Sequence, residues 1–471
     1  MPLTNMQTII PVQLDKVYNT SDYRLENDRR PLTSCQIALN AQDNIITTGC
    51  YIQDENFNIG IAQQAWNVIF EQYPFLTSKI VFNENEKWQF LEPQDGVKYE
   101  LPQTLKNINN YSDLDTILNK TYVSDTKLCN LDLYTLSIEQ LPFKYLMIFQ
   151  LPHSMSDGSS VTFLLQKFNK YYKIIKSGST VSLDYIQKGP FTALSAVPYD
   201  VNLQPTESKL KPPMITQVKG FQDSSNTRQY QKYHVRFQKR SEFQFKKFQN
   251  TTVTHSMYAT QLIMQCAFLY YSKQVELNQP INQFLMDLIR DYEFYNKWGR
   301  YTELNYENVL GLSIFTYPFT VSINQNSSIS DIIKQIQSAV NRIEQFDVRS
   351  HFAFLLSLDK IFVKDISFRY PMSTYAANLG KFENESPICS FSLASVSLVD
   401  NMNPAPCNFS ALSSNDYIVF NQQHNDGFSS EDYDKFFELF KVIQNKVSQM
   451  DPAEFKIQDA IQLLEQTFGQ K

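Results

Sequence analysis

The hydrophobic pattern of the first 176 residues predicts a mixed set of strands and helices. Short apolar runs typical of strands stand at Ser34–Ala41, Ile45–Ile52, Phe75–Phe82, Trp88–Leu91, Leu131–Ile138 and Tyr145–Leu151. Apolar residues spaced by three and four predict a helix over Asn58–Tyr73, which Pro74 closes. A second helix follows the last strand and runs to Ile175. Its apolar face comprises Val161, Leu164, Leu165, Phe168, Tyr171, Tyr172 and Ile175.

Residues 177–232 break this periodicity with prolines and polar runs, and they read as a crossover linker. A second set of elements begins near Tyr233. Helices are expected at Ser241–Gln249, His255–Lys273 with Thr254 as N-cap, Ser328–Phe346, His351–Leu358, Ser430–Val447 and Pro452–Phe468. Strands are expected at Gln283–Ile289, Val309–Ile323, Phe391–Val399 and Tyr417–Gln423. The pattern therefore predicts two mixed α/β domains, 1–176 and 233–471, joined by the linker 177–232.

A weak internal repeat supports this division. Ile148–Gly158 and Val419–Gly427 both contain a strand, then a histidine, then Asp-Gly before a helix rich in Phe and Lys. The spacing from histidine to aspartate is four residues in the first copy and two in the second. A duplicated fold in which one copy keeps the working geometry explains the likeness, and chance similarity between two amphipathic segments is the alternative.

Composition narrows the class of protein. The 471 residues are 42% hydrophobic and 14% aromatic, enough for large cores, and the net charge of −6 argues against nucleic-acid binding. The first residues form no basic and apolar leader, and the apolar run Ala259–Tyr271 is too short for a transmembrane segment. A soluble, cytoplasmic protein is expected. The six cysteines form no Cys-x-x-Cys pair, so no metal site is predicted.

The turn after Tyr145–Leu151 carries the candidate chemistry. Pro152 ends the sheet ladder, His153 follows in the turn, and Asp157-Gly158 precede the helix. Glycine tolerates a positive φ, and Ser159 or Ser160 can cap the helix. Imidazole suits a general base because its ordinary pKa is about 6.5. An ordinary strand-to-helix turn, with the aspartate as helix cap, is the plain alternative.

The sequence contains no Gly-x-Ser-x-Gly nucleophile motif, which favours direct transfer of an acyl group without a covalent enzyme intermediate. His153 would take the proton from a hydroxyl or amine that attacks an activated carbonyl. The other four histidines, at 234, 255, 351 and 424, lack a comparable frame and are expected to be incidental.

The segment His153–Gly158 resembles the HxxxDG motif of the coenzyme A-dependent acyltransferases related to chloramphenicol acetyltransferase. That superfamily includes alcohol O-acetyltransferases, plant BAHD acyltransferases, wax ester synthases and peptide-synthetase condensation domains. The resemblance implies an α/β (mixed α+β) fold of two pseudo-symmetric chloramphenicol-acetyltransferase-like domains with a channel between them. It also implies transfer from acyl-CoA, with acetyl-CoA as the expected donor, to a small alcohol or amine. O-acyl transfer is favoured, with no permanently bound cofactor and a monomeric protein.

The resemblance assigns roles to six residues. His153 is the general base, and Asp157 and Gly158 shape the turn, with Asp157 paired to Arg290. A surface cation is the plain alternative for Arg290. Ser373 and Asn378 resemble a family segment on the acyl-donor side, although a plain turn explains them equally well.

Two departures from the family pattern leave alternatives open. Condensation domains and wax synthases usually carry two adjacent histidines, whereas Pro152 precedes His153 here, and no DFGWG segment matches that of BAHD enzymes. The alcohol O-acetyltransferase-like branch fits better. The alternatives are a condensation-like enzyme that uses a carrier-bound thioester, a hydrolase, and a non-catalytic protein that retains the fold.

Overall fold

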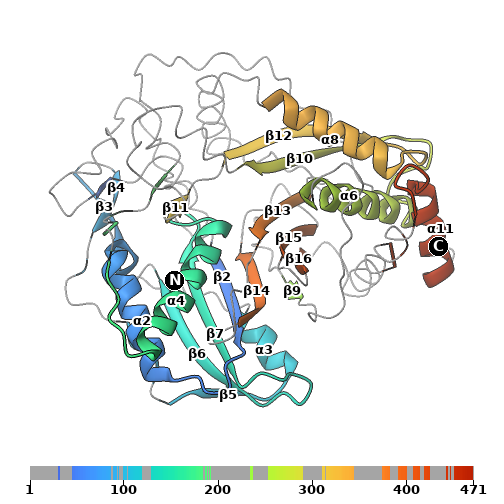
Figure 1. Cartoon of the computed structure of the whole chain (residues 1–471). Helices are drawn as coiled ribbons and strands as arrows, with labels where there is room; N and C mark the ends of the chain where they lie inside the picture. Colours follow the sequence, from blue (N-terminus) through green and yellow to red (C-terminus); the bar gives the residue numbers. More distant parts are fainter. Residues whose placement is uncertain are drawn as a thin grey trace.

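The computed structural model describes two groups of helices and strands, each formed mainly by one half of the chain (Figure 1). The described residues are 30–31, 45–85, 88–92, 94, 99–102, 104–118, 129–183, 186–187, 189, 191–192, 234–236, 253–289, 310–312, 315–343, 374–381, 391–399, 407–413, 418–424, 442–443, 446 and 450–469.

The first group is built on a five-stranded sheet in the order β14–β2–β7–β6–β5. The strands are β2 (Ile45–Ile52), β5 (Lys106–Ile108), β6 (Asn130–Leu136), β7 (Tyr145–Pro152) and β14 (Phe391–Val399). In Figure 1 the orange β14 lies beside the blue β2, to which it pairs antiparallel from Phe391↔Ile52 to Val399↔Ile45. The second half of the chain therefore supplies a strand to the sheet of the first half.

Helices cover both faces of this sheet because the side chains of each strand alternate between them. Helices α2 (Ile59–Gln72) and α4 (Gly158–Lys176) pack on the face that carries Met147, Phe149 and Leu151. The short α3 (Tyr111–Leu118) packs on the opposite face. The α2 helix begins where expected, because the Asn58 side chain accepts a hydrogen bond from the Ile61 N–H at 3.1 Å.

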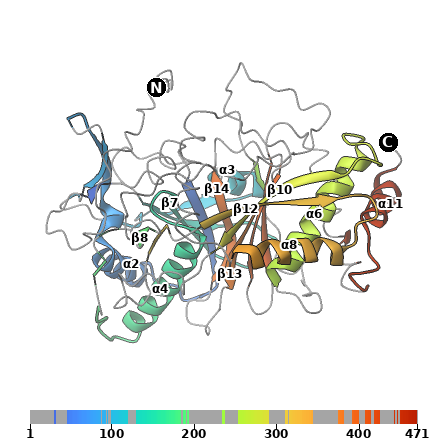
Figure 2. The ribbon, with the colours of Figure 1, turned by 90° about the horizontal axis from the view of Figure 1, so that it is seen from above.

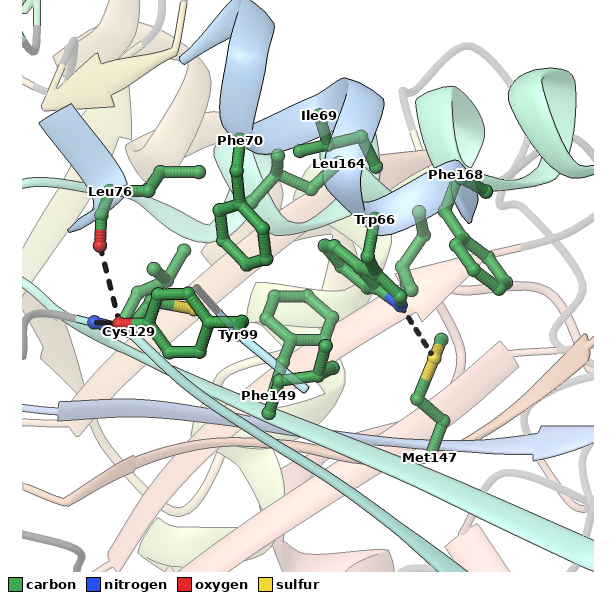
Figure 3. Close-up of a cluster of buried hydrophobic side chains, with 14 of the residues drawn as sticks. Trp66, Ile69, Phe70, Leu76, Tyr99, Cys129, Met147, Phe149, Leu164 and Phe168 are labelled. Atoms are coloured by element: carbon green, nitrogen blue, oxygen red, sulfur yellow. Dashed lines mark hydrogen bonds between the residues drawn. The ribbon is translucent and has the colours of Figure 1, made fainter. Parts of the chain in front are cut away.

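The core between the sheet, α2 and α4 is rich in aromatic side chains (Figure 3). Trp66 is 1% exposed, and its ring centroid lies 5.2 Å from that of Phe168 and 5.9 Å from that of Phe149. Its indole N–H donates to the Met147 sulfur at 3.4 Å. This packing fixes α4, and with it the turn that precedes α4, against β7.

A small sheet in the order β1–β4–β3 flanks the first group. It comprises β1 (Arg30–Pro31), β3 (Lys79–Asn83) and β4 (Trp88–Glu92), and β3 and β4 form the expected hairpin.

The second group is built on a six-stranded sheet in the order β12–β10–β13–β15–β16–β9. Its strands are β9 (His234–Arg236), β10 (Ile281–Ile289), β12 (Phe315–Ile323), β13 (Thr374–Lys381), β15 (Cys407–Ser413) and β16 (Ile418–His424). Helices α6 (Val253–Tyr271), α8 (Ile329–Ile343) and α11 (Ile457–Phe468) share one buried core with residues of β12. In Figure 2 these helices gather at one end of the molecule, opposite α2 and α4.

The two halves also meet at a short parallel pair. Strand β11 (Gly311–Leu312) pairs with β8 (Phe191–Thr192), and Leu310, which precedes β11, is fully buried in the aromatic core of the first half. The division into 1–176, 177–232 and 233–471 stays a prediction.

Some local expectations were wrong. Phe75–Phe82 does not form one strand, because Pro74–Thr77 is a 3-10 helix (η2) in which the Thr77 hydroxyl donates to the Pro74 carbonyl. Thr254 is not an N-cap, because α6 already begins at Val253. The elements α3, β5, β13 and β15 were not predicted from the hydrophobic pattern. The predicted elements Ser34–Ala41, Ser241–Gln249, His351–Leu358 and most of Ser430–Val447 lie outside the described residues.

None of the helices in the described part of the chain combines the length and the hydrophobicity that a membrane-spanning helix needs.

Candidate active site

The turn between β7 and α4 holds His153 in a defined position. The backbone N–H of Met155 and the hydroxyl of Ser156 both donate to the Pro152 carbonyl, each at 3.0 Å. These two bonds close the chain into a compact turn directly after the last residue of β7. His153 is 8% exposed, and its Nδ1 lies 2.8 Å from the Ser156 carbonyl oxygen.

This contact decides the tautomer of His153. A carbonyl oxygen only accepts hydrogen bonds, so Nδ1 has to carry the hydrogen. In the neutral ring the lone pair then lies on Nε2. The ring is both oriented and prepared to accept a proton at Nε2, which is what a general base requires.

Asp157 caps α4. Its backbone is extended (φ −123°, ψ 177°), its Oδ1 accepts from the Ser160 N–H at 2.8 Å, and the same Oδ1 lies 2.9 Å from the Ser160 hydroxyl oxygen. The Asp157 N–H donates back to the Ser160 hydroxyl at 3.3 Å, which completes a capping box. Asp157 is 1% exposed. The N-cap of α4 is therefore Asp157, as the plain alternative for the motif expects. The expectation that Ser159 or Ser160 caps the helix is wrong.

Gly158 is the first residue of α4, directly after the Asp157 cap. In the described part of the chain, glycines with a positive φ are Gly178 and Gly469. The structural role of Gly158 at the active site stays a prediction.

A strip of polar side chains crosses the sheet near the end of β7. Gln150 is 2% exposed, and its amide donates to the fully buried Thr47 hydroxyl at 2.9 Å. The Asn130 amide donates to Asp132 at 3.3 Å and reaches the Gln150 oxygen at 3.5 Å. These bonds tie β2, β7 and β6 together beside the turn, and the sequence pattern did not single them out.

The other predicted site residues are only partly within the described chain. Asn378 lies in β13, where its Cα pairs with Ala411, and a register shift follows between Asn378 and Lys381. Strand β13 lies against α4, the helix that follows His153. Arg290 and Ser373 lie outside the described residues, so the Asp157–Arg290 pair stays a prediction. The second copy of the repeat ends β16 at His424, and its Asp426-Gly427 also lies outside.

Comparison with known proteins identifies the fold. No protein-family model matches the sequence, and no curated protein matches it either. A mutant of the starter condensation domain of rhizomide synthetase RzmA, solved with C8-CoA and Leu-SNAC, superposes with a TM-score of 0.62 at 10% identity, over 91% of this chain and 96% of that one. The epimerization domain from the third module of tyrocidine synthetase B gives 0.59 at 12% identity, over 92% and 97%. The X-domain from teicoplanin biosynthesis gives 0.58 at 11% identity, over 95% and 99%.

The chain therefore has the condensation-domain fold, in which two chloramphenicol-acetyltransferase-like lobes are related by pseudo-symmetry. The structures that it matches belong to the coenzyme A-dependent acyltransferase superfamily. The expected resemblance and fold class are confirmed at the level of the fold, and the channel between the lobes stays a prediction.

Proposed function

We propose that the protein transfers an acyl group from a thioester to a hydroxyl or amine, with His153 as the general base. The observation that carries this proposal is the hydrogen bond from Nδ1 of His153 to the Ser156 carbonyl, which leaves Nε2 as the proton acceptor at the end of β7. The condensation-domain fold supports a transferase, because this turn stands in a fold shared with acyl-transferring domains.

In the proposed reaction the acceptor attacks the thioester carbonyl while Nε2 of His153 takes the acceptor's proton. A C–O or C–N bond forms, the tetrahedral intermediate collapses, and the C–S bond breaks. The thiolate leaves with the proton that His153 holds, so the enzyme returns to its starting state. Ser156, a hydroxyl close to the base in sequence, is already engaged as a donor to the Pro152 carbonyl. That engagement favours direct transfer over a serine acyl-enzyme.

The proposal also names the acyl donor. An acyl-CoA, in the first instance acetyl-CoA, is the donor that the sequence motif favours, with an alcohol as acceptor. One matching structure was solved with C8-CoA, which supports testing longer acyl chains as well. A carrier-bound thioester is the second candidate donor, because matching structures include condensation and epimerization domains of synthetases and of a polyketide synthase.

The test is product identification with purified protein. Acetyl-CoA, octanoyl-CoA and the same two acyl groups on a carrier protein are each incubated with a panel of alcohols, amines and an amino-acid thioester. Free thiol is followed by its colour reaction and the acyl product by mass spectrometry. The proposal expects an ester or amide in equal amount to the thiol released. Free acid as the main product would make the protein a hydrolase, and no thiol release from any donor would make it a non-catalytic relative.

A further inference from the structure

Ser160 connects the catalytic turn to a strand from the other half of the chain. Its hydroxyl donates to the Gly311 carbonyl at 2.7 Å and accepts from the Gly311 N–H at 3.3 Å, although the two residues are 151 positions apart. The same hydroxyl accepts from the Asp157 N–H at 3.3 Å. Ser160 is fully buried. One hydroxyl thus joins the start of α4 to β11.

The Asp157 N–H belongs to the peptide group whose carbonyl is that of Ser156. A peptide group is planar, so its C=O and N–H turn together. At one end of this plane the carbonyl accepts from Nδ1 of His153, and at the other end the N–H donates to Ser160. The imidazole of His153 and the hydroxyl of Ser160 therefore bond to the two ends of one rigid peptide group.

The first half of the chain holds β11 firmly from its other side. The Gln187 side chain donates to the Leu310 carbonyl at 2.6 Å and accepts from the Leu310 N–H at 2.9 Å. The backbone N–H of Gln187 in turn donates to the Gln72 carbonyl in α2 at 2.8 Å. The hydrogen bonds of Gln187 go to Leu310, Gly189 and Gln72, so a change at Gln187 alters the position of β11 through Leu310.

We propose that Ser160 is a positioning residue, through which the docking of β11 holds the Ser156–Asp157 peptide, and hence His153, in the orientation for proton transfer. The inference rests on the proposed function, because it assigns a role in the same reaction. It goes beyond a helix cap, since a cap would explain the bonds between Ser160 and Asp157 but not the two bonds to Gly311.

The kinetic test compares Ser160→Ala, Gln187→Ala, the double variant and the control Ser177→Ala. Ser177 lies at the other end of α4, where its hydroxyl donates to the Ile174 carbonyl. Misplacing a catalytic group by about 1 Å can cost about 100-fold, so Ser160→Ala is expected to lower kcat by about 10- to 100-fold, with the donor KM changed by less than about threefold. Gln187→Ala should lower kcat by a smaller factor. The double variant should be no slower than Ser160→Ala, because both changes break one connection.

The idea fails if Gln187→Ala keeps the wild-type kcat, or if the two losses multiply, because Ser160 would then act as a cap alone. Ser177→Ala should behave as wild type. If Ser160→Ala does not fold, Gln187→Ala by itself still tests the inference.

A second readout needs no turnover, which separates failure of this inference from failure of the proposed function. Hydrogen–deuterium exchange reports the opening of backbone segments. Gln187→Ala should raise deuterium uptake at 310–312 and also at 153–157, and should shift the Nδ1–H resonance of His153 in NMR spectra. Faster uptake at 310–312 alone, with an unmoved resonance, would overturn the relay even in a protein without activity.

Discussion

Nδ1 of His153 and the carbonyl oxygen of Ser156 lie 2.8 Å apart, within a single turn of the chain. This bond fixes the tautomer and the direction of the ring at once, and it needs no other side chain. A carboxylate partner, as in a Ser-His-Asp triad, is not required to orient this histidine. The motif aspartate is then left for a structural role at the start of α4.

The tautomer is directly measurable. With uniformly ¹⁵N-labelled protein at a pH where the ring is neutral, two-bond ¹H–¹⁵N spectra should show the proton of His153 on Nδ1 and a lone pair on Nε2. The His153→Gln variant assigns the resonances by their loss. A proton found on Nε2 instead would contradict the orientation on which the proposed function depends.

Removing the cap at Asp157 should weaken both stability and activity. Asp157→Ala deletes the acceptor of the Ser160 N–H, and loss of an N-cap typically costs about 0.5–2 kcal/mol. Asp157→Asn keeps one acceptor oxygen. If capping is the only role of Asp157, this variant should lower the free energy of unfolding by less than Asp157→Ala does. Urea unfolding of both variants checks this order.

The predicted ion pair between Asp157 and Arg290 would change the expected stability of Asp157→Asn. If a buried pair exists, Asp157→Asn leaves a buried cation uncompensated, and its cost should rise to about 3–5 kcal/mol. The double variant with Arg290→Gln should then recover part of the loss. Additive losses in the double variant would exclude the pair.

Much of the first half was predictable because its pattern is local. The helix over Asn58–Tyr73 and the strand Tyr145–Leu151 follow from spacing alone, and the structure places them within one residue. The helix α3 was missed because eight residues give too few turns for a clear period.

What the sequence did not reveal is long-range. Nothing in the pattern of Phe391–Val399 indicates that this strand joins β2 of the first half, because an apolar run specifies a strand but not its partner. The contact of Ser160 with Gly311 was missed for the same reason. The motif itself was found because His153, Asp157 and Gly158 fall within six consecutive residues.

The aromatic core behind the turn should be sensitive to truncation. Trp66→Ala removes a side chain that is 1% exposed and packed on Phe168 and Met147, so the free energy of unfolding should fall by about 3–5 kcal/mol. Leu277→Ala, at a side chain that is 51% exposed, should change it by less than about 0.5 kcal/mol. Urea unfolding followed by circular dichroism measures both. Equal urea midpoints for the two variants would contradict the burial of Trp66 in the aromatic core.

Acid should remove the stabilisation that the Asp331 carboxylate provides at the start of α8. The Ser328 N–H and hydroxyl donate to the Asp331 carboxylate at 3.0 and 2.8 Å, and these bonds hold the pKa of Asp331 below its ordinary value of 3.8. A group with a lowered pKa in the folded state stabilises the protein above its ordinary pKa. That contribution is lost as the pH falls through the lower folded value.

Asp331→Asn should therefore lower the urea midpoint at pH 7, and the gap to wild type should narrow below about pH 4. Glu454→Gln, at an exposed residue, serves as the control. A gap that stays constant down to the lowest pH at which both proteins remain folded would show that the carboxylate charge is not involved.

The most direct test of the central claim is the rate of acyl transfer in His153→Ala, measured with the donor and acceptor that wild type uses best. The matched control is His424→Ala, because His424 ends β16 as His153 follows β7. General-base assistance is typically worth about 10²–10⁴-fold, so His153→Ala should lose at least about 100-fold in kcat while His424→Ala keeps the wild-type rate. A His153→Ala protein that releases thiol and forms product as fast as wild type would contradict the account.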